Sequence, residues 1–432
     1  MSENTIFKEF DALSLNDWLA KVEKDLKGKK SLEDLNWNFE GLKISPFIRN
    51  HNTYSPSFSK KDNIWLTNVI INEVDISKAN QQALEVLKFG VDSLSFKVEI
   101  NSDNDLKNLL NGIQTEIIHL NFYTKNLEQL TDIISDSNLN LNYAILFSPT
   151  SSEDLSAAVK KSNKSNSKLF LINGSNYGSI GSTLVQELAF ALSELIEYIE
   201  ATKLSSINLD EVIQKITFQF STGTSFFPEI AKYRAFRHLF SSICSEYGIT
   251  KPETHILSTT NSYYFSASDE HNNLLRATTS TMAAIIGGCN EINVLGFNNN
   301  SISNNDKNEA VRLAINIQHI LKYESFLDKV KDASSGAYYI ENLTKVMIEE
   351  TWKLVLEIEE KGGYFKALES GFVHQLIQQN HSQNVKDIMD GKKVMVGINK
   401  YQNKNQSSVQ PKDIPMASKE YELNQSAKEV NS

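Results

Sequence analysis

The residues of this chain that could do chemistry follow the ends of predicted strands. Glu73 and Asp75 come after the first strand, and residues 173–178, 221–224 and 259–261 follow the fifth, sixth and seventh strands. These segments carry mainly hydroxyl and amide side chains and glycines, which orient a ligand but rarely transfer protons or hold a metal ion. No histidine lies at any of these four strand ends. The sequence therefore predicts a polar opening with few groups for catalysis.

Three histidines elsewhere have ordinary structural interpretations. His119 lies within a predicted strand, where a packed imidazole is more common than a ligand. His238 lies on a predicted helix beside Arg234 and Arg237, a pattern typical of a solvated or interface face. His319 has no partner at metal-ligand spacing. None of the three is therefore predicted to be a catalytic or metal-ligating residue.

The segment from Asp269 to Leu274 matches the first half of a motif that binds a cofactor. Many enzymes hold cobalamin with Asp-x-His-x-x-Gly, and this chain has Asp269, His271 and then Leu274 where the glycine is required. The string also precedes a helix, and no strand–helix unit of the cobalamin-binding type surrounds it. It is therefore not interpreted as a cobalamin site.

Short apolar, β-branched runs alternate with amphipathic helical segments from residue 65 onward. This alternation predicts an α/β fold, a (β/α)8 barrel of the TIM type, because eight strand–helix units span about the 250 residues such a barrel needs. An open, doubly wound sheet is the alternative, since it shows the same alternation. The predicted strands cover residues 65–71, 93–98, 116–122, 140–147, 168–172, 215–220, 254–259 and 291–297.

The chain divides into four predicted parts. Residues 1–64 form an N-terminal arm and linker, 65–323 the barrel, 324–401 a C-terminal helical extension and 402–432 a disordered tail. The tail is rich in Asn, Gln, Ser, Lys and Glu, so it has too little apolar surface to fold alone. Two further helices are expected near residues 344–361 and 371–389.

Composition narrows the class of protein. The net charge of −10 argues against a surface that coats nucleic acid, which requires clustered cations. Two isolated cysteines, Cys244 and Cys289, favour a reducing cytoplasm over a disulfide-bonded secreted protein. We also expect no membrane association, because no apolar run approaches the roughly 20 residues that span a bilayer.

Several spaced blocks resemble the barrel domain of methylmalonyl-CoA mutases. One run, Trp37-Asn38-Phe39-Glu40-Gly41-Leu42-Lys43-Ile44, is similar to the family's Trp-x-Thr-x-Glu-Gly-Ile-x-Ile. The resemblance is firm from about residue 168 to 401 and plausible for the first fifty residues. The blocks are residues 37–44, 226–237, 272–288, 312–325, 336–344, 359–363 and 396–401.

The resemblance also implies that the pocket is degenerate. Catalytic members have a histidine in the seventh strand that binds the thioester carbonyl, and Leu257 falls at its position. The arginine that grips the substrate carboxylate falls on Glu200, and a loop glutamine falls on Gly178. The family's Arg-Gly-Pro-Tyr loop and its cobalamin domain have no counterpart here.

The resemblance therefore implies a small, non-catalytic subunit of adenosylcobalamin-dependent methylmalonyl-CoA mutase. Such a chain binds no cofactor itself and forms a heterodimer with a catalytic large (alpha) subunit, which carries adenosylcobalamin. We expect residues 1 to about 50 to contact that partner, although this arm packing on its own barrel is an alternative. Two other functions stay open: a stand-alone acyl-CoA-binding barrel, and an acyl-CoA mutase that uses a cobalamin domain in trans.

Overall fold

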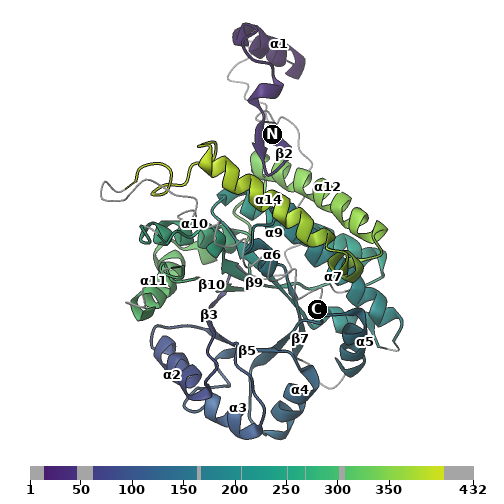
Figure 1. Ribbon diagram of the computed structural model, residues 1–432, viewed down its shortest axis with the longest axis vertical. Coiled ribbons are helices and arrows are strands. Elements are labelled where there is room, and N and C mark those ends of the chain that lie inside the picture. The colour runs from purple at the N-terminus through teal and green to yellow at the C-terminus, as the bar shows by residue number, and fades with distance from the viewer. Residues whose placement is uncertain are drawn as a thin grey trace, which may run out of the picture.

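The computed structural model describes residues 14–45, 62–162, 167–205, 207–250, 252–267, 269–300 and 307–402. Its centre is a closed barrel of parallel strands in the order β10-β3-β4-β5-β6-β7-β8-β9 (Figure 1). The predicted barrel is confirmed and the open sheet is excluded, because β10 pairs with both β3 and β9. The strands are β3 Leu66–Ile71, β4 Ser93–Phe96, β5 His119–Thr124, β6 Tyr143–Phe147, β7 Lys168–Asn173, β8 Ile216–Thr222, β9 His255–Thr260 and β10 Glu291–Asn293.

Each strand of the barrel overlaps a predicted one, but two boundaries differ for a visible reason. The predicted third strand starts at residue 116, whereas β5 starts at His119 because the N–H groups of Ile117 and Ile118 donate to the carbonyl of Gln114 in a turn. The last strand ends early because the N–H of Leu295 donates to the hydroxyl of Thr260, at 2.8 Å.

Helices fill the crossovers and surround the barrel (Figure 1). Many begin at a Ser, Thr, Asp or Asn whose side chain accepts an N–H of the first turn, which satisfies a donor that the helix leaves free. The helices are α2 Ile76–Leu87, α3 Asp103–Leu109, α4 Leu127–Asp136, α5 Ser152–Lys161, α6 Ser175–Gly178, α7 Leu184–Lys203, α8 Leu209–Gln214, α9 Phe226–Glu246, α10 Asn272–Ile286 and α11 Lys307–His319.

The two faces of each strand have different surroundings. Outward-facing aromatic side chains pack against the helices, and burying each stabilises the fold by roughly 1.5–3 kcal/mol. Inward-facing positions are mostly polar, as the alternation along β4 and β5 shows: Ser93, Ser95 and Asn121 hydrogen-bond one another or a common partner inside the barrel. The outward aromatic set includes Phe96, Phe122, Phe170, Phe218 and Phe220.

The N-terminal arm has two parts that behave differently. Helix α1, Leu15–Leu26, has no buried residue and stands away from the barrel (Figure 1). The hairpin that follows pairs β1, Trp37–Phe39, with β2, Leu42–Ile44. Leu42 and Ile44 belong to the main hydrophobic core, and β2 lies against α12. The hairpin therefore packs on the barrel, which was the alternative considered for this arm, whereas α1 does not.

Three helices follow the barrel: α12 Tyr338–Glu360, α13 Tyr364–Glu369 and α14 Phe372–Met389. Helix α12 packs against α9 and α7, which explains why it starts six residues before the predicted helix at residue 344. Among the described residues, no helix has the length and apolar character to cross a membrane. The predicted linker at residues 50–63 falls mostly, and the predicted tail almost wholly, outside the described residues.

Candidate functional site

Leu257 lines the interior of the barrel. It lies in the middle of β9, level with Gln219 of β8 and Glu291 of β10. Because alternate residues of a strand share a face, Leu257 points to the same side as His255, which contacts Glu291 inside the barrel. The side chain is fully buried. An aliphatic group at this point can neither donate nor accept a hydrogen bond.

Gly178 lies in the loop that follows β7, at the C-terminal end of the strands. It ends α6, and its carbonyl accepts a hydrogen bond from the amide of Asn261 at 3.0 Å. A Cβ atom at this position would lie 1.9 Å from the hydroxyl oxygen of Ser221, so the space that a side chain needs is already filled. A glutamine could not be accommodated here without moving Ser221.

Glu200 does not belong to this region, and the prediction that placed it in the pocket is wrong. Helix α7 starts near the C-terminal ends of the strands and runs back along the barrel, so its residue 200 lies about 24 Å from its start. The carboxylate of Glu200 is half-exposed and pairs with Lys203 at 3.0 Å. Lys203 in turn lies over the ring of Tyr247 at the end of α9. The structure thus places Leu257 inside the barrel and Gly178 at the C-terminal ends of the strands. Glu200 lies on the outside of the barrel, toward the opposite end.

A buried ion cluster fixes the C-terminal end of β8. Lys232 of α9 is fully buried and contacts Glu187 at 3.0 Å and Glu229 at 2.7 Å. Glu187 accepts the N–H of Ser221, and Glu229 accepts the N–H of Gly223, each at 2.6 Å. Burial alone would lower the pKa of Lys232, but the two carboxylates raise it above its usual value. The cluster therefore joins α7, α9 and the end of β8 around one charged ammonium.

The hairpin of the arm contributes a further carboxyl to this end of the barrel. Glu40 and Gly41 form its turn, both with positive φ, and the Glu40 carboxyl accepts the N–H of Leu184, the first residue of α7, at 2.9 Å. Burial raises the pKa of Glu40 to about 7, although this N–H lowers it. The hairpin is thus tied to the barrel by a helix cap as well as by apolar contacts.

A second buried carboxylate organises the other end of the barrel interior. Glu291 is fully buried, and one of its oxygens accepts hydrogen bonds from Asn68 at 3.2 Å, Ser93 at 2.8 Å and Asn121 at 2.8 Å. Its other oxygen lies 2.7 Å from Nε2 of His255 and 3.5 Å from Nε2 of His119. The predicted packed imidazole of His119 is therefore part of a polar cluster whose side chains come from five strands, β3, β4, β5, β9 and β10.

The arginines beside His238 were predicted on a solvated or interface face, and this is wrong for both. Arg234 is fully buried and pairs with Asp332 at 2.5 Å and Glu341 at 2.7 Å. Arg237 is buried and donates to the carbonyls of Gly287 and Gly288. Both fix the segments around α9 in place.

The residues that could suggest a cofactor do not fit one. His271 stacks on the ring of Phe297, with ring centres 4.9 Å apart, and Asp269 accepts a hydrogen bond from the amide of Asn272 at 2.6 Å. These contacts form the start of α10 and not a strand–helix loop that could hold cobalamin. Within the described ranges, no group of three or more His, Cys, Asp or Glu side chains could hold a metal ion.

Sequence reasoning missed the two carboxylate clusters, although one left a signal. Glu229 and Lys232 lie three residues apart on α9, at the spacing of an ion pair on one helix face, and ionisable side chains are seldom fully buried unless they are paired. Glu291 gave no local signal, because its partners come from strands up to 223 residues away in the chain.

The fold and interior define a (β/α)8 barrel whose axial site is filled by mutually bonded side chains. The methylmalonyl-CoA mutase family profile matches residues 131–431. The chain is 30% identical to the methylmalonyl-CoA mutase small subunit of Porphyromonas gingivalis over 92% of its length, covering 71% of that protein. It is also 34% identical to the methylmalonyl-CoA mutase of Rhizobium meliloti over 56% of its length, and 31% identical to that of Escherichia coli over 53%. The chain belongs to the methylmalonyl-CoA mutase family.

The chain spans about a third of these last two relatives, 34% and 32% of their lengths. It also matches the methylmalonyl-CoA mutase large subunit of Porphyromonas gingivalis, with 28% identity over 53% of this chain and 32% of that protein. One organism therefore contains both a small and a large relative of this chain.

Proposed function

We propose that this chain is the non-catalytic small subunit of a heterodimeric methylmalonyl-CoA mutase, which interconverts methylmalonyl-CoA and succinyl-CoA. The catalytic large subunit binds adenosylcobalamin, which supplies the radical chemistry. The observation that carries the proposal is the barrel interior: Leu257 places an aliphatic side chain where the family's catalytic members have a histidine. The filled space beside Gly178 supports the same conclusion. We place the complex in the cytoplasm, because a chain with only two widely separated cysteines is typical of a reducing compartment.

This function predicts that the chain alone neither binds cobalamin nor converts methylmalonyl-CoA. We expect no cobalamin absorbance after reconstitution and no succinyl-CoA, whereas the co-purified complex with the large subunit is active. Leu257→His should not restore turnover, because one imidazole cannot act without the cofactor and the other groups of the site. The measurement is succinyl-CoA formation by the isolated chain and by its Leu257→His variant. Turnover by either of them without the large subunit would show that this chain is a catalyst.

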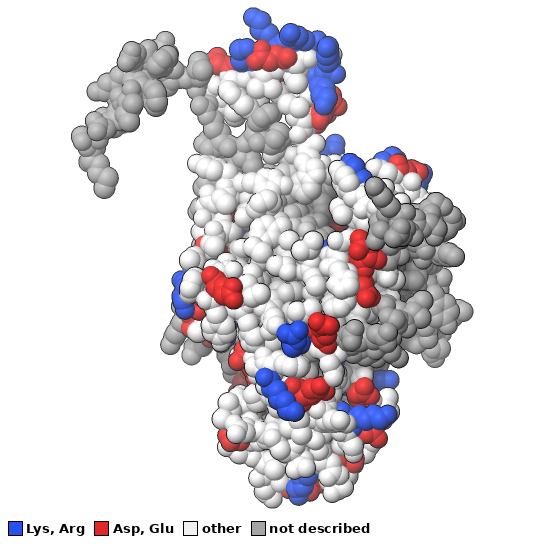
Figure 2. Space-filling view, turned by 90° about the vertical axis from the view of Figure 1, so that its left-hand side faces the viewer, with Lys and Arg blue, Asp and Glu red and all other residues white. Residues whose placement is uncertain are grey.

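The proposed surface for the large subunit starts with helix α1. Its apolar side chains include Leu15 and Trp18, which are 41% and 37% exposed, and they have no core of their own. Trp37 of the hairpin continues this exposed apolar surface beside the ring of Tyr339. Figure 2 shows a largely uncharged face of the molecule, on which basic and acidic side chains are interspersed. This differs from the continuous basic patch that binds nucleic acid. Exposed aromatic groups of this kind act as anchors in protein interfaces.

We therefore predict that deleting residues 1–31 weakens association with the large subunit. The deletion removes α1 and keeps the hairpin, so Leu42, Ile44 and the Glu40 cap remain in the fold. Loss of aromatic anchors should cost about 2–4 kcal/mol of association, or roughly 30- to 1,000-fold in Kd. Sedimentation or calorimetry measures this loss.

Two single substitutions provide the matched comparison. Trp18→Ala should weaken the complex, whereas Trp352→Ala should not, although Trp352 is 39% exposed on α12. Unchanged affinity after the deletion, with the barrel still folded, would mean that α1 does not contact the partner.

A stand-alone acyl-CoA-binding barrel, or a mutase with a cobalamin domain in trans, makes a different prediction. Either would work without a stoichiometric large subunit. Co-purification from the native source distinguishes the proposed function from both alternatives. The proposed function requires a one-to-one complex with the large subunit, and neither alternative does.

A further inference from the structure

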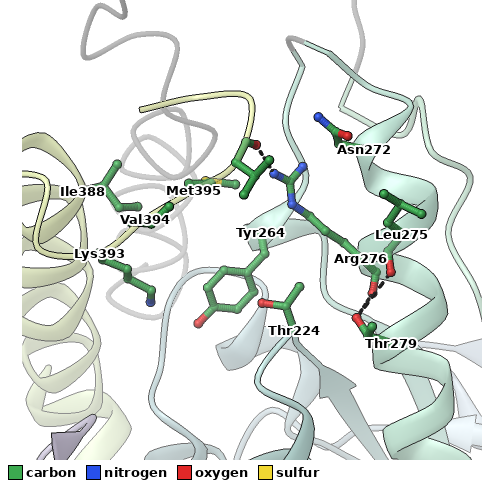
Figure 3. A pocket seen from close by; sticks show the side chains of 11 residues that line it. Thr224, Tyr264, Asn272, Leu275, Arg276, Thr279, Ile388, Lys393, Val394 and Met395 are labelled. Atoms are coloured by element: carbon green, nitrogen blue, oxygen red, sulfur yellow. Dashed lines mark hydrogen bonds between the residues drawn. The ribbon is translucent and has the colours of Figure 1, made fainter. Parts of the chain in front are cut away.

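A cavity of about 360 Å³ lies between α10 and the segment that follows α14 (Figure 3). Thr224, after β8, and Tyr264, after β9, come from the loops at the C-terminal end of the barrel. The walls come from α10 on one side and from residues 393–396 on the other. Its volume is within the range of sites for small organic ligands.

Two basic side chains enter this cavity from different elements. Arg276 of α10 donates to the amide oxygen of Asn273 at 2.8 Å and to the carbonyl of Val396 at 2.6 Å. Lys393 donates to the amide oxygen of Asn384 at 3.1 Å, and its ammonium lies 5.1 Å from the ring centre of Tyr264. In Figure 3, Arg276 points into the cavity from the right wall and Lys393 from the left.

The charges of these two groups are only partly compensated. Burial lowers the pKa of Lys393, although Glu40 and Asp387 act to raise it. Burial likewise lowers the pKa of Arg276, with Asp269 acting to raise it. Both cations have therefore lost water without gaining a carboxylate in contact, since their direct hydrogen bonds go to neutral amide and carbonyl oxygens.

The rest of the cavity offers the hydroxyl groups of Thr224 and Tyr264 and an apolar wall. Among the described residues, the hydroxyl of Tyr264 has no hydrogen-bond partner. Leu275, Val394 and Val396 line the rim and are 68%, 51% and 48% exposed. Exposed apolar side chains grouped around a cavity mark a binding surface.

We propose that this cavity binds a small organic anion, a carboxylate on a short aliphatic body. The carboxylate would lie against Lys393 and Arg276, with the Tyr264 hydroxyl as a further donor. The aliphatic body would cover Leu275, Val394 and Val396. A carboxylate fits because Arg276 already uses two of its nitrogens for protein oxygens and leaves few donors for a larger anion. This site is separate from the barrel interior, so it does not depend on the proposed function.

Hexanoate is the probe, with two fragments as controls. Hexan-1-ol has the aliphatic body without the charge, and acetate has the carboxylate without the body. Calorimetric titration of the full chain should show saturable binding of hexanoate, and binding of both fragments should be about tenfold weaker or more, because each lacks one half of the recognition. Absence of saturable hexanoate binding, or equal binding of hexan-1-ol, would overturn the proposal.

Variants then test the named residues. Lys393→Met should weaken hexanoate binding about tenfold or more, since it keeps the length of the side chain and removes its charge. Lys392→Met is the matched control: Lys392 is exposed, pairs with Asp390 at 3.5 Å and does not line the cavity. Equal losses in the two variants would overturn the assignment.

Two substitutions of opposite charge at the exposed position Leu275 test the proposal even if Lys393→Met does not fold. Leu275 is largely exposed, so both Leu275→Glu and Leu275→Lys should fold normally. Leu275→Glu should reduce hexanoate binding strongly through repulsion of the carboxylate, and Leu275→Lys should retain it. Equal binding by these two variants would count against an anion in this cavity.

Discussion

Replacement of Lys232 by methionine is expected to destabilise the fold by about 3–5 kcal/mol, because it leaves two buried carboxylates without their cation. Glu187 and Glu229 both contact the Lys232 ammonium, and neither can reach bulk water. Burial already raises the pKa of Glu187, and Lys232 opposes that increase. Without the ammonium, at least one carboxyl must take up a proton or move, which loosens the N–H groups of Ser221 and Gly223 at the end of β8.

Denaturant unfolding of the full chain measures this loss of stability. Two further variants show whether the loss comes from the buried charge. Lys353→Met on α12 removes an exposed lysine and should change stability by less than about 0.5 kcal/mol. The triple variant Lys232→Met, Glu187→Gln, Glu229→Gln should be much more stable than the single variant, because no buried charge remains. If the triple variant were as unstable as the single one, packing and not charge would be responsible.

Sequence periodicity was sufficient to predict the barrel. Each strand has an apolar outer face that must meet a helix, so the alternation appears in the local sequence of segments such as residues 116–122 and 254–259. The boundaries were less accurate, because side-chain hydrogen bonds such as that of Thr260 end a strand without a signal in the hydrophobic pattern.

The site was harder to predict, for two physical reasons. Glu200 was assigned to the pocket from a short string, but the direction of α7 places that residue at the other end of the barrel. Helix length alone would have shown this, since sixteen residues advance the helix by about 24 Å. The polar cluster of Glu291 was invisible for a different reason: closure of the barrel brings β3, β4 and β5 to β10, and no local pattern encodes those contacts.

Arg234 and Arg237 likewise have partners that are distant in the sequence, so their burial could not be predicted locally. A run with two arginines and a histidine was interpreted as an exposed face, yet both guanidinium groups are buried. Their partners lie about fifty to a hundred residues further along the chain, at Gly287, Asp332 and Glu341. Composition predicts exposure for such residues on average, and tertiary pairing decides the individual case.

Glu291 should be the most sensitive position inside the barrel. We expect Glu291→Ala to destabilise the fold by about 3–5 kcal/mol, because the donors of Asn68, Ser93 and Asn121 lose their common acceptor in a space that also becomes a cavity. Glu350→Ala, an exposed acid paired with Lys353, is the control and should change stability by less than about 0.5 kcal/mol. A loss below 1 kcal/mol for Glu291→Ala would mean that these donors have other partners.

The dependence on pH separates charge from hydrogen bonding at the same position. Burial alone would raise the pKa of Glu291, but the bond to His255, the imidazole charges and the Ser93 hydroxyl lower it to about 2. Since the folded pKa lies below the ordinary 4.5, the stabilisation from the ionised carboxylate is present above about pH 5 and is lost as the pH falls toward 2. Glu291→Gln keeps an oxygen for the three donors but turns an N–H toward His255, which must then stay neutral. Burial lowers the pKa of His255, and the bond to Glu291 opposes this lowering. We therefore expect Glu291→Gln to cost less stability than Glu291→Ala at pH 8. Its cost relative to the wild type should grow as the pH falls below the ordinary histidine value of 6.5, in unfolding measured from pH 8 to pH 5. A constant difference from the wild type across that range would show that the charge of Glu291 does not interact with the two imidazoles.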